Sequence, residues 1–388
     1  MVVIGLDCIT GLQTARIFAK RGVPVIALAG DVDHYCCQTN VCQLIVPAEI
    51  KTEGLIETLE ALAATLDAKA VLMPCTDMSV LLISRFRDRL RPWYYFALPT
   101  EQVVETLIDK VGFYTYAAQA HLPIPRTFFL RSQADADRAA AEIGYPCILK
   151  PPIKSPEWER NTKKKVFKLE GRAEFLAIYQ RCAGWAEVLM VQEWIEGPDS
   201  SLYSCNCYFD ANNRPQVTFV ARKLRQWPPE TGTSCLGEEV RNDIVLQASL
   251  RLFQGIGYHG LGYLEMKQDQ RTGTHLIIEP NIGRPTGRSA ISEFAGIELL
   301  YTMYCDLTGL PLPTCRQQRY KGTKWIYLRR DLQSAYYYWR KGQLSLLGWI
   351  KSLWGARQDA VFSWRDMRPF LVDLGGSASS LFGRRKSK

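Results

Sequence analysis

The most constraining feature of this chain is a predicted hairpin over residues 262–281 that carries two glutamates. Its flanks alternate between apolar and polar residues as strands do, and a turn-forming cluster at 270–274 separates them. If the hairpin is centred on the middle residue of that cluster, Glu265 pairs directly with Glu279, and Asn281 shares their face. The fold must therefore accommodate two carboxylates and an amide at one place on a sheet.

Two glutamates in this arrangement need a neutralising partner, because like charges directly opposed across a sheet destabilise it. Hard oxygen ligands of this kind suit Mg²⁺ held against a phosphate. The alternative is a solvated hairpin in which Lys267, on the same face, balances one carboxylate. The hairpin alone leaves both interpretations open, so the rest of the chain has to decide between them.

The composition limits the class of protein. With 388 residues, 47% of them hydrophobic and 22% charged, the chain has the composition of a globular protein of roughly two to three domains. It has no apolar run of about eighteen residues that would predict a transmembrane helix, and its start lacks the basic segment of a signal peptide. The twelve cysteines are scattered, which predicts a reducing, cytoplasmic protein without a zinc site. The net charge of +9 favours anionic partners such as a nucleotide, an acidic substrate or a membrane surface.

The N-terminal part of the chain predicts a parallel, doubly wound α/β unit. Residues 1–30 have the pattern of strand, loop, helix and strand, and a helix over 53–65 leads to another strand over 70–73. Ligands of such units bind at the carboxyl ends of the strands, which here carry Gly5-Leu6-Asp7 and Thr76-Asp77. We therefore expect these loops to help bind a substrate.

The rest of the chain predicts non-repeating helices and strands, followed by a tail of different character. We expect helices over 101–121, 133–144, 244–253 and 291–305, and strands over 146–150, 187–193, 202–209 and 216–222. Beyond Lys324, tryptophan, tyrosine, arginine and lysine alternate, and the chain ends in Arg384-Arg385-Lys386-Ser387-Lys388. Such a tail is either a basic amphipathic segment on an anionic membrane or a helical layer packed on the rest of the protein. Asp331, Asp359 and Asp366 interrupt the basic field and favour the packed layer.

Five motifs, taken in order, resemble the ATP-grasp superfamily. They are Asp109-Lys110, the break at Pro123-Ile124-Pro125, Tyr145-Pro-Cys-Ile-Leu-Lys150-Pro151, Val191-Gln-Glu193-Trp-Ile195-Glu-Gly197-Pro-Asp199 and Glu265…Glu279-Pro-Asn281. Within the superfamily the chain looks most like the D-aspartate-ligase-like carboxylate–amine ligases. That likeness rests on Lys150-Pro-Pro-Ile-Lys-Ser-Pro-Glu-Trp158, Arg222-Lys-Leu-Arg225-Gln-Trp-Pro-Pro229 and Arg284-Pro-Thr-Gly-Arg288-Ser289.

The resemblance implies an ATP-grasp fold of mixed α/β and α+β class. Residues 1–108 would form an N-terminal, Rossmann-like domain with a parallel sheet. Two α+β subdomains, 109–192 and 193–324, would clasp ATP between them, and the second would carry the metal site. Residues 325–388 would form a basic, aromatic C-terminal extension of helices.

On this resemblance, one group of residues binds the nucleotide. Lys110 and Lys150 would contact the ATP phosphates, for which a compact ammonium is suited. Without the surrounding motifs, each would simply be an exposed lysine at the end of an element. Glu193 would accept a hydrogen bond from the adenine amino group, and the backbone of Ile195 would pair with the ring. Asp199 would hold the ribose hydroxyls, although it could equally be a turn carboxylate.

A second group would bind metal and promote the reaction. Glu265, Glu279 and Asn281 match the Mg²⁺ ligands of the superfamily, and two Mg²⁺ ions, or Mn²⁺ in their place, would bridge the terminal phosphates. Arg284 and Arg288 would then face the transferred phosphoryl group and the substrate carboxylate, since arginine binds both in bidentate fashion. A solvated basic loop is the alternative for these two arginines.

The sequence departs from the superfamily pattern in two places. The segment after Lys150 should be a glycine-rich lid, yet it is rich in proline and lysine, with no glycine before Gly171. The lysines at 163–165 would supply positive charge there or form a solvated charge run. The usual arginine two residues after the asparagine is Gly283 here, and Arg284 follows one position later.

The resemblance implies an ATP- and Mg²⁺-dependent ligase that joins a carboxylate to an amine of an amino-acid-like substrate through an acyl phosphate. Two other functions stay open: a membrane-surface or assembly protein with a regulatory nucleotide site, and a bicarbonate-using ATP-grasp carboxylase. The expected partners are small-molecule substrates, with peripheral membrane contact through the tail and a homodimer as further expectations. No nucleic acid is expected, because basic and aromatic residues do not form a recognisable module.

Overall fold

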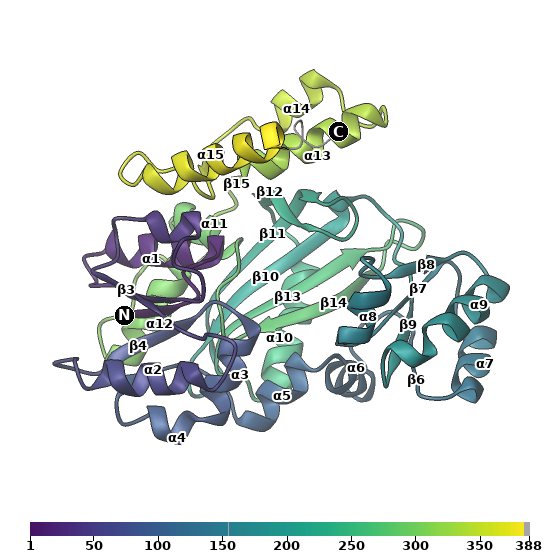
Figure 1. Cartoon of the computed structure of the whole chain (residues 1–388), viewed down its shortest axis with the longest axis horizontal. Helices are drawn as coiled ribbons and strands as arrows, with labels where there is room; N and C mark the ends of the chain where they lie inside the picture. Colours follow the sequence, from purple (N-terminus) through teal and green to yellow (C-terminus); the bar gives the residue numbers. More distant parts are fainter. Residues whose placement is uncertain (154, 384–388) are drawn as a thin grey trace.

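Three β-sheets organise the chain, and the largest of them lies between the other two (Figure 1). The computed structural model describes residues 1–153 and 155–383, and their side chains through residue 375. The basic C-terminus predicted at 384–388 therefore lies outside the described residues.

The N-terminal sheet is parallel and has five strands in the order β3-β2-β1-β4-β5. Its strands are β1 (Val2–Ile4), β2 (Ile26–Ala29), β3 (Leu44–Pro47), β4 (Ala70–Pro74) and β5 (Tyr94–Tyr95), with helices α1 (Ile9–Ala19), α2 (Gly54–Ala63), α3 (Asp77–Arg85) and α4 (Arg87–Leu90). Because β1 pairs in parallel with both β2 and β4, the loops after β1 and β4 leave the sheet at the same edge. The predicted α/β unit is confirmed.

The second sheet has four antiparallel strands in the order β6-β9-β7-β8 and its own hydrophobic core. Its elements are β6 (Thr127–Leu130), α7 (Gln133–Glu142), β7 (Cys147–Lys150), α8 (Pro156–Asn161), β8 (Phe167–Leu169), α9 (Arg172–Cys182) and β9 (Leu189–Glu193). The predicted capping residue Ser132 accepts a hydrogen bond from the backbone nitrogen of Asp135 at 3.2 Å and starts α7.

The third sheet has seven strands in the order β14-β13-β10-β11-β12-β15-β16. Its first five strands in the sequence are β10 (Leu202–Phe209), β11 (Pro215–Trp227), β12 (Thr233–Glu239), β13 (Gly260–Gln268) and β14 (His275–Ile282), with α10 (Asp243–Gly255), α11 (Ser289–Phe294) and α12 (Leu299–Thr308). These five strands pair in antiparallel fashion, and together they form the long central sheet of Figure 1.

Two segments were each predicted as one continuous helix, and both predictions are wrong because each segment forms two helices. The helix expected over 101–121 divides into α5 (Glu101–Ile108) and α6 (Lys110–Gln119). Asp109 is extended between them, and its carboxylate accepts a hydrogen bond from the backbone nitrogen of Gly112 at 2.7 Å, which caps α6. The helix expected over 291–305 divides into α11 and α12 near Gly296, whose φ of +85° no helix can contain.

In its described part, through Gly383, the tail adds two strands and three helices. They are β15 (Lys324–Ile326), α13 (Leu328–Arg340), α14 (Leu346–Ser352), β16 (Arg357–Asp359) and α15 (Arg368–Gly383). Arg225 of β11 forms a two-bond ion pair with Asp331 of α13, from Nε to Oδ1 at 2.8 Å and from Nη2 to Oδ2 at 3.0 Å. Asp331 is fully buried and also accepts a hydrogen bond from Nε1 of Trp349 in α14. A buried ion pair therefore joins the tail to the large sheet.

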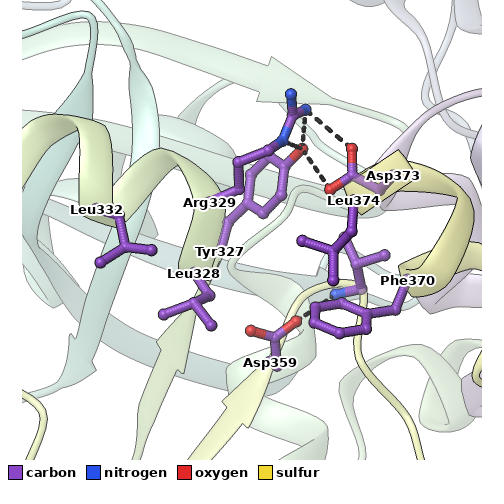
Figure 2. A pocket seen from close by; sticks show the side chains of 9 residues that line it. Tyr327, Leu328, Arg329, Leu332, Asp359, Phe370, Asp373 and Leu374 are labelled. Carbon is purple, nitrogen blue, oxygen red and sulfur yellow. Dashed lines mark hydrogen bonds and ion pairs between the residues drawn. The ribbon is translucent and has the colours of Figure 1, made fainter. Parts of the chain in front are cut away.

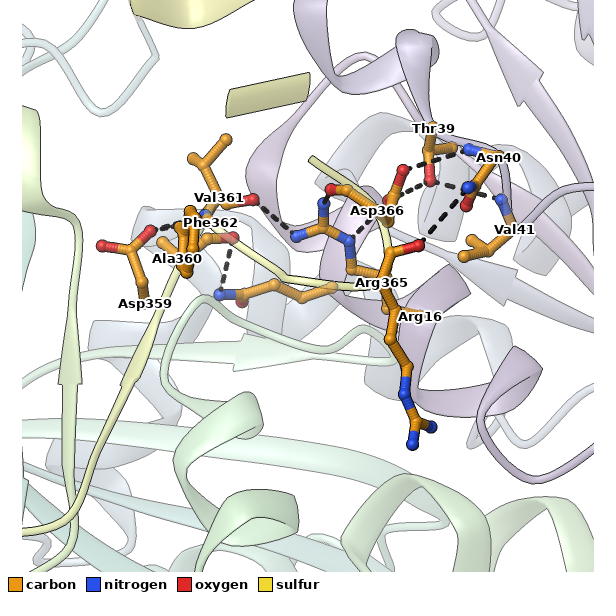
Figure 3. Close-up of polar contacts among 11 residues, drawn as sticks. Arg16, Thr39, Asn40, Val41, Asp359, Ala360, Val361, Phe362, Arg365 and Asp366 are labelled. Carbon is orange, nitrogen blue, oxygen red and sulfur yellow. Dashed lines mark hydrogen bonds and ion pairs between the residues drawn. The ribbon is translucent and has the colours of Figure 1, made fainter. Parts of the chain in front are cut away.

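The tail also contacts the N-terminal unit. The hydroxyl of Tyr327 lies 3.4 Å from that of Tyr35 in the N-terminal unit. Within the tail, Arg329 and Tyr327 both reach the carboxylate of Asp373 on α15, at 3.0 and 3.5 Å (Figure 2). In Figure 3, Nε of Arg16 on α1 donates to Oδ2 of Asp366 at 2.8 Å. Among the described residues, no helix combines the length and the apolar character needed to cross a membrane. The domain boundaries after residues 108, 192 and 324 stay predictions.

Candidate functional site

The predicted hairpin is formed by β13 and β14, and Glu265 is paired directly with Glu279. Asn281 lies two residues farther along the strand, on the face of Glu279. On the turn side of this pair the register slips by one residue, so that Ile278 forms a β-bulge. The bulge adds one residue to β14. As a result, Glu265 and Glu279 are paired as a hairpin centred on Thr272 predicts.

Glu265 is neutralised by two cations of the same sheet region. Its Oε2 lies 2.5 Å from Nη2 of Arg288, and its Oε1 lies 3.4 Å from Nζ of Lys223. The alternative in which Lys267 balances a glutamate is wrong, because its ammonium lies over the ring of Trp194, 4.9 Å from the ring centre. Cationic residues of the chain itself therefore neutralise Glu265, one of the two opposed glutamates that the sequence predicted.

Lys223 is a candidate site residue that the sequence reasoning missed. Every second residue of β11 from Val217 to Arg225 is buried, and the last two of these are Lys223 and Arg225. Burial lowers the pKa of Lys223, and the charge of Glu265 partly offsets that effect. The sequence itself indicated this burial. Strict alternation along the strand puts Lys223 and Arg225 in register with the apolar residues Val217, Phe219 and Ala221. Buried cations of this kind need anionic partners.

Lys110, Lys150 and Glu279 come together from α6, β7 and β14. The pKa of Lys150 is lowered to about 8, chiefly by burial and also by the charge of Lys110, while the charge of Glu279 opposes both effects. The charges of Lys110 and Glu279 both act on Lys150, and the hydroxyl of Tyr114 on α6 donates to the backbone oxygen of Ile278 on β14 at 2.6 Å, which joins these two elements. No ion pair or side-chain hydrogen bond joins any of the three to another described residue. Two ammonium groups with one carboxylate suit an anionic ligand such as a phosphate.

Arg284 connects β14 to the N-terminal unit. Its Nη2 lies 2.5 Å from Oδ1 of Asn281, and its Nε lies 2.6 Å from Oδ1 of Asp77, the first residue of α3. Gly283 has a φ of +65°, and a Cβ atom there would lie 2.4 Å from Cδ2 of Leu98. A side chain at position 283 would therefore strain the backbone and crowd Leu98 and Val80.

Arg288 is almost fully buried beside Glu265. Its guanidinium carbon lies 5.0 Å from the centre of the Tyr263 ring. Burial lowers its pKa, although a guanidinium paired with a carboxylate stays charged. Its Nη1 is buried and has no hydrogen-bond partner among the described residues. A buried, charged donor without a partner is costly, so this nitrogen is suited to receive an anionic group of a ligand.

The three residues predicted to bind adenosine lie in different environments. The Glu193 carboxylate is near Arg126, with Oε1 3.9 Å from Nε, and Ile195 is buried. Asp199 is buried as well, and it accepts hydrogen bonds from Nε2 of Gln226 and from the hydroxyl of Tyr338, each at 2.6 Å. Both carboxylate oxygens of Asp199 therefore have partners inside the protein, and its contact with ribose stays a prediction.

The segment predicted as a lid carries exposed lysines. Lys163, Lys164 and Lys165 are all exposed, and Nζ of Lys165 donates to the backbone oxygen of Thr231 in the turn between β11 and β12, at 3.3 Å. The ammonium of Lys164 lies over the ring of Phe167, 5.5 Å from its centre, and Lys163 follows the expectation of a solvated charge. Lys154 of this segment lies outside the described residues, whereas the residues before and after it are described.

The predicted metal ligands contribute oxygen atoms from both strands of the hairpin. Among the described residues, no three His, Cys, Asp or Glu side chains form a group that could hold a metal ion. The predicted set is of another kind, with two carboxylates and one amide. Glu279 has a carboxylate without a partner in the described part of the chain, whereas Glu265 and Asn281 also contact cationic side chains. This donor set fits a hard cation shared with a phosphate.

Known proteins of two kinds are similar to this chain. The D-aspartate ligase of Enterococcus faecium is 28% identical over 260 residues, which are 63% of this chain and 61% of that protein. A D-alanine–D-alanine ligase of Pseudomonas entomophila is 23% identical over 54% of this chain and 58% of that protein. The chain thus spans less than two thirds of the length of these curated relatives. No family model matches the chain.

Solved structures share its fold. The biotin carboxylase of Campylobacter jejuni superposes with a TM-score of 0.65, at 16% identity, over 83% of this chain and 74% of that one. The N5-carboxyaminoimidazole synthetase of Staphylococcus aureus has a TM-score of 0.63, at 16% identity, over 82% and 79%. At such identities the likeness concerns the arrangement of the sheets and helices.

Proposed function

The chain has the fold of the ATP-grasp superfamily, and from this premise we propose that it is an ATP- and Mg²⁺-dependent ligase that joins a carboxylate to an amine. The observation that carries the proposal is the grouping of Lys110, Lys150 and Glu279, whose charged ends have no partner among the described residues. In the proposal the two lysines bind the phosphates of ATP, and Glu193 and the backbone of Ile195 bind the adenine.

The metal site belongs to the same proposal. Glu265, Glu279 and Asn281 would hold Mg²⁺, as two ions or with Mn²⁺ in their place. When bound, the metal neutralises charge on the phosphates during transfer. Lys223 contacts one carboxylate oxygen of Glu265 and Arg288 the other, so the two cations together fix the orientation of that carboxylate.

The reaction would proceed in two steps without a protein nucleophile. A carboxylate oxygen of the substrate attacks the terminal phosphorus of ATP, ADP leaves, and an acyl phosphate forms. The amine then attacks the acyl carbon, phosphate leaves, and the nitrogen loses a proton. In this scheme, Arg288 offers its unpartnered Nη1 to the substrate carboxylate or the developing oxyanion. Arg284, held by Asp77, places a second charge at the edge of the N-terminal sheet, where substrates of such units bind.

The relatives suggest a substrate class. Because they are named as ligases for D-aspartate and for D-alanine, an amino-acid-like substrate is proposed here. The structural likeness to a biotin carboxylase concerns the fold, so a bicarbonate-using carboxylase is not favoured over the ligase. A cytoplasmic location and a homodimer stay predictions.

The test is a screen for ADP release in which amino acids and acidic metabolites are supplied as carboxylate and amine. ADP release is expected to require one of each and to be abolished in Glu279→Ala, while an exposed glutamate changed in Glu60→Gln serves as the matched control. With an ¹⁸O-labelled carboxylate, the label should appear in the released phosphate. Normal turnover by Glu279→Ala would contradict the metal assignment, and ATP binding without turnover on any pair would favour a regulatory nucleotide site. A strict need for bicarbonate would favour the carboxylase.

A further inference from the structure

Helices α13 and α14 leave an apolar surface open to solvent. Between them lies a groove of about 360 Å³ lined by Leu332, Ala335, Tyr336, Trp339, Leu344, Ser345, Leu346 and Trp349. On the outer side of α14, Leu347 is 70% exposed and Trp354, just after the helix, is 81% exposed. We call these residues together the α13–α14 surface. Contiguous exposed apolar patches of this kind mark interaction sites on soluble domains.

The orientation of α13 is fixed by polar contacts on its other side. Asp331 is held by Arg225, and the hydroxyl of Tyr338 donates to Asp199. Because these anchors face the large sheet, Leu332, Tyr336 and Trp339 form a stripe at helical spacing that faces solvent. The exposed stripe is therefore a consequence of how the helix is attached and not of a loosely packed tail.

The segment that forms this surface carries charges of one sign, and the acidic residues Asp359 and Asp373 lie beyond Leu332 at its edge. From Leu332 to Gln358 the sequence has four basic residues, Arg340, Lys341, Lys351 and Arg357, and no acidic residue. All four are exposed. Residues 325–388 hold twelve of the 48 lysines and arginines and four of the 39 acidic residues, so eight of the nine net positive charges lie in the tail. The rest of the chain is nearly neutral.

We propose that the α13–α14 surface binds the anionic face of a lipid bilayer. Tryptophan and tyrosine are suited to the boundary between headgroups and acyl chains, and the exposed leucines can enter the outer part of the acyl layer. The basic residues beside them match a surface of uniform negative charge. A soluble protein partner offers both signs of charge, which this surface does not complement. The proposal concerns the tail alone and does not depend on the ligase reaction.

The test is sedimentation of the full-length protein with vesicles of phosphatidylcholine, with and without phosphatidylglycerol. The protein is expected to bind the anionic vesicles and to be released by salt. Leu347→Ser combined with Trp354→Ser should weaken binding by at least about tenfold, because two large side chains leave the contact. Lys341→Gln with Lys351→Gln should weaken it by roughly tenfold or more, because each basic residue near an anionic surface contributes separately.

Trp93→Ser is the control, since Trp93 is an exposed tryptophan, 51% exposed, that lies on the N-terminal unit. It should bind vesicles like the unchanged protein. Circular dichroism of each variant checks that the fold is kept. Equal binding by the Leu347/Trp354 variant would overturn the proposal, and so would equal binding to neutral vesicles. Absence of vesicle binding, with a dimer that this variant dissociates in analytical ultracentrifugation, would make the surface a subunit interface instead.

Discussion

Removing the charge of Asp331 tests whether the buried ion pair with Arg225 attaches the tail. The arginine is 7% exposed and the aspartate 0%, and two hydrogen bonds of 2.8 and 3.0 Å join them. In Asp331→Asn the amide oxygen can still accept one of the two hydrogen bonds from Arg225. The amide nitrogen takes the place of the second oxygen and, being a donor, cannot accept the other. Breaking a buried pair by removing one partner costs about 3–5 kcal/mol, because the remaining charge is left buried. We expect the free energy of unfolding to fall by that amount.

The assay is urea denaturation followed by tryptophan fluorescence, with hydrogen exchange of α13 to locate the loss. Glu60→Gln is the control, since Glu60 makes a similar two-bond pair with Arg89 at the surface, at 2.8 and 2.6 Å. Exposed pairs of this kind contribute about 0–1 kcal/mol. Equal destabilisation by the two variants would refute the reasoning. Arg225→Met combined with Asp331→Leu should recover part of the loss, because no charge then stays buried.

ATP affinity should fall as the pH rises through about 8, because the Lys150 ammonium, whose pKa burial lowers to about 8, loses its proton there. ATP binding is expected to be about tenfold weaker one to two pH units above that value. Calorimetry at several pH values measures this change. A decline of the same size in Lys150→Met would contradict the prediction. Tyr338→Phe removes the donor 2.6 Å from Asp199 and should lower the free energy of unfolding by about 1.5–3 kcal/mol, as for hydrogen bonds to charged groups. Unchanged stability in urea denaturation would show that Asp199 does not need this partner.

The parts of the site that follow from local spacing could be predicted from the sequence. Strand alternation and a short turn were enough to pair Glu265 with Glu279, and the bulge at Ile278 kept that pairing in place. The N-terminal sheet was predictable for the same reason, since its strands and helices alternate within short distances along the chain.

The parts that depend on distant contacts could not be predicted. Arg225 and Asp331 are 106 positions apart, and no local pattern says that they meet. The break before α6 was missed because Asp109 and Lys110 also fit a continuous amphipathic helix, whereas the cap depends on the backbone direction at Gly112. The role of Lys223 depends on Glu265, 42 positions away, and no local pattern says that the two meet.

The central claim is that the hairpin carboxylates form part of a Mg²⁺·ATP site, and ATP binding with and without Mg²⁺ tests it most directly. Calorimetry on the unchanged protein should show binding that is tighter with Mg²⁺ than with a chelator. In Glu279→Gln this dependence on Mg²⁺ should drop by about 10–100-fold, the range expected when a metal site is damaged. Glu60→Gln should behave like the unchanged protein. The same dependence on Mg²⁺ in Glu279→Gln and in the unchanged protein would contradict the account.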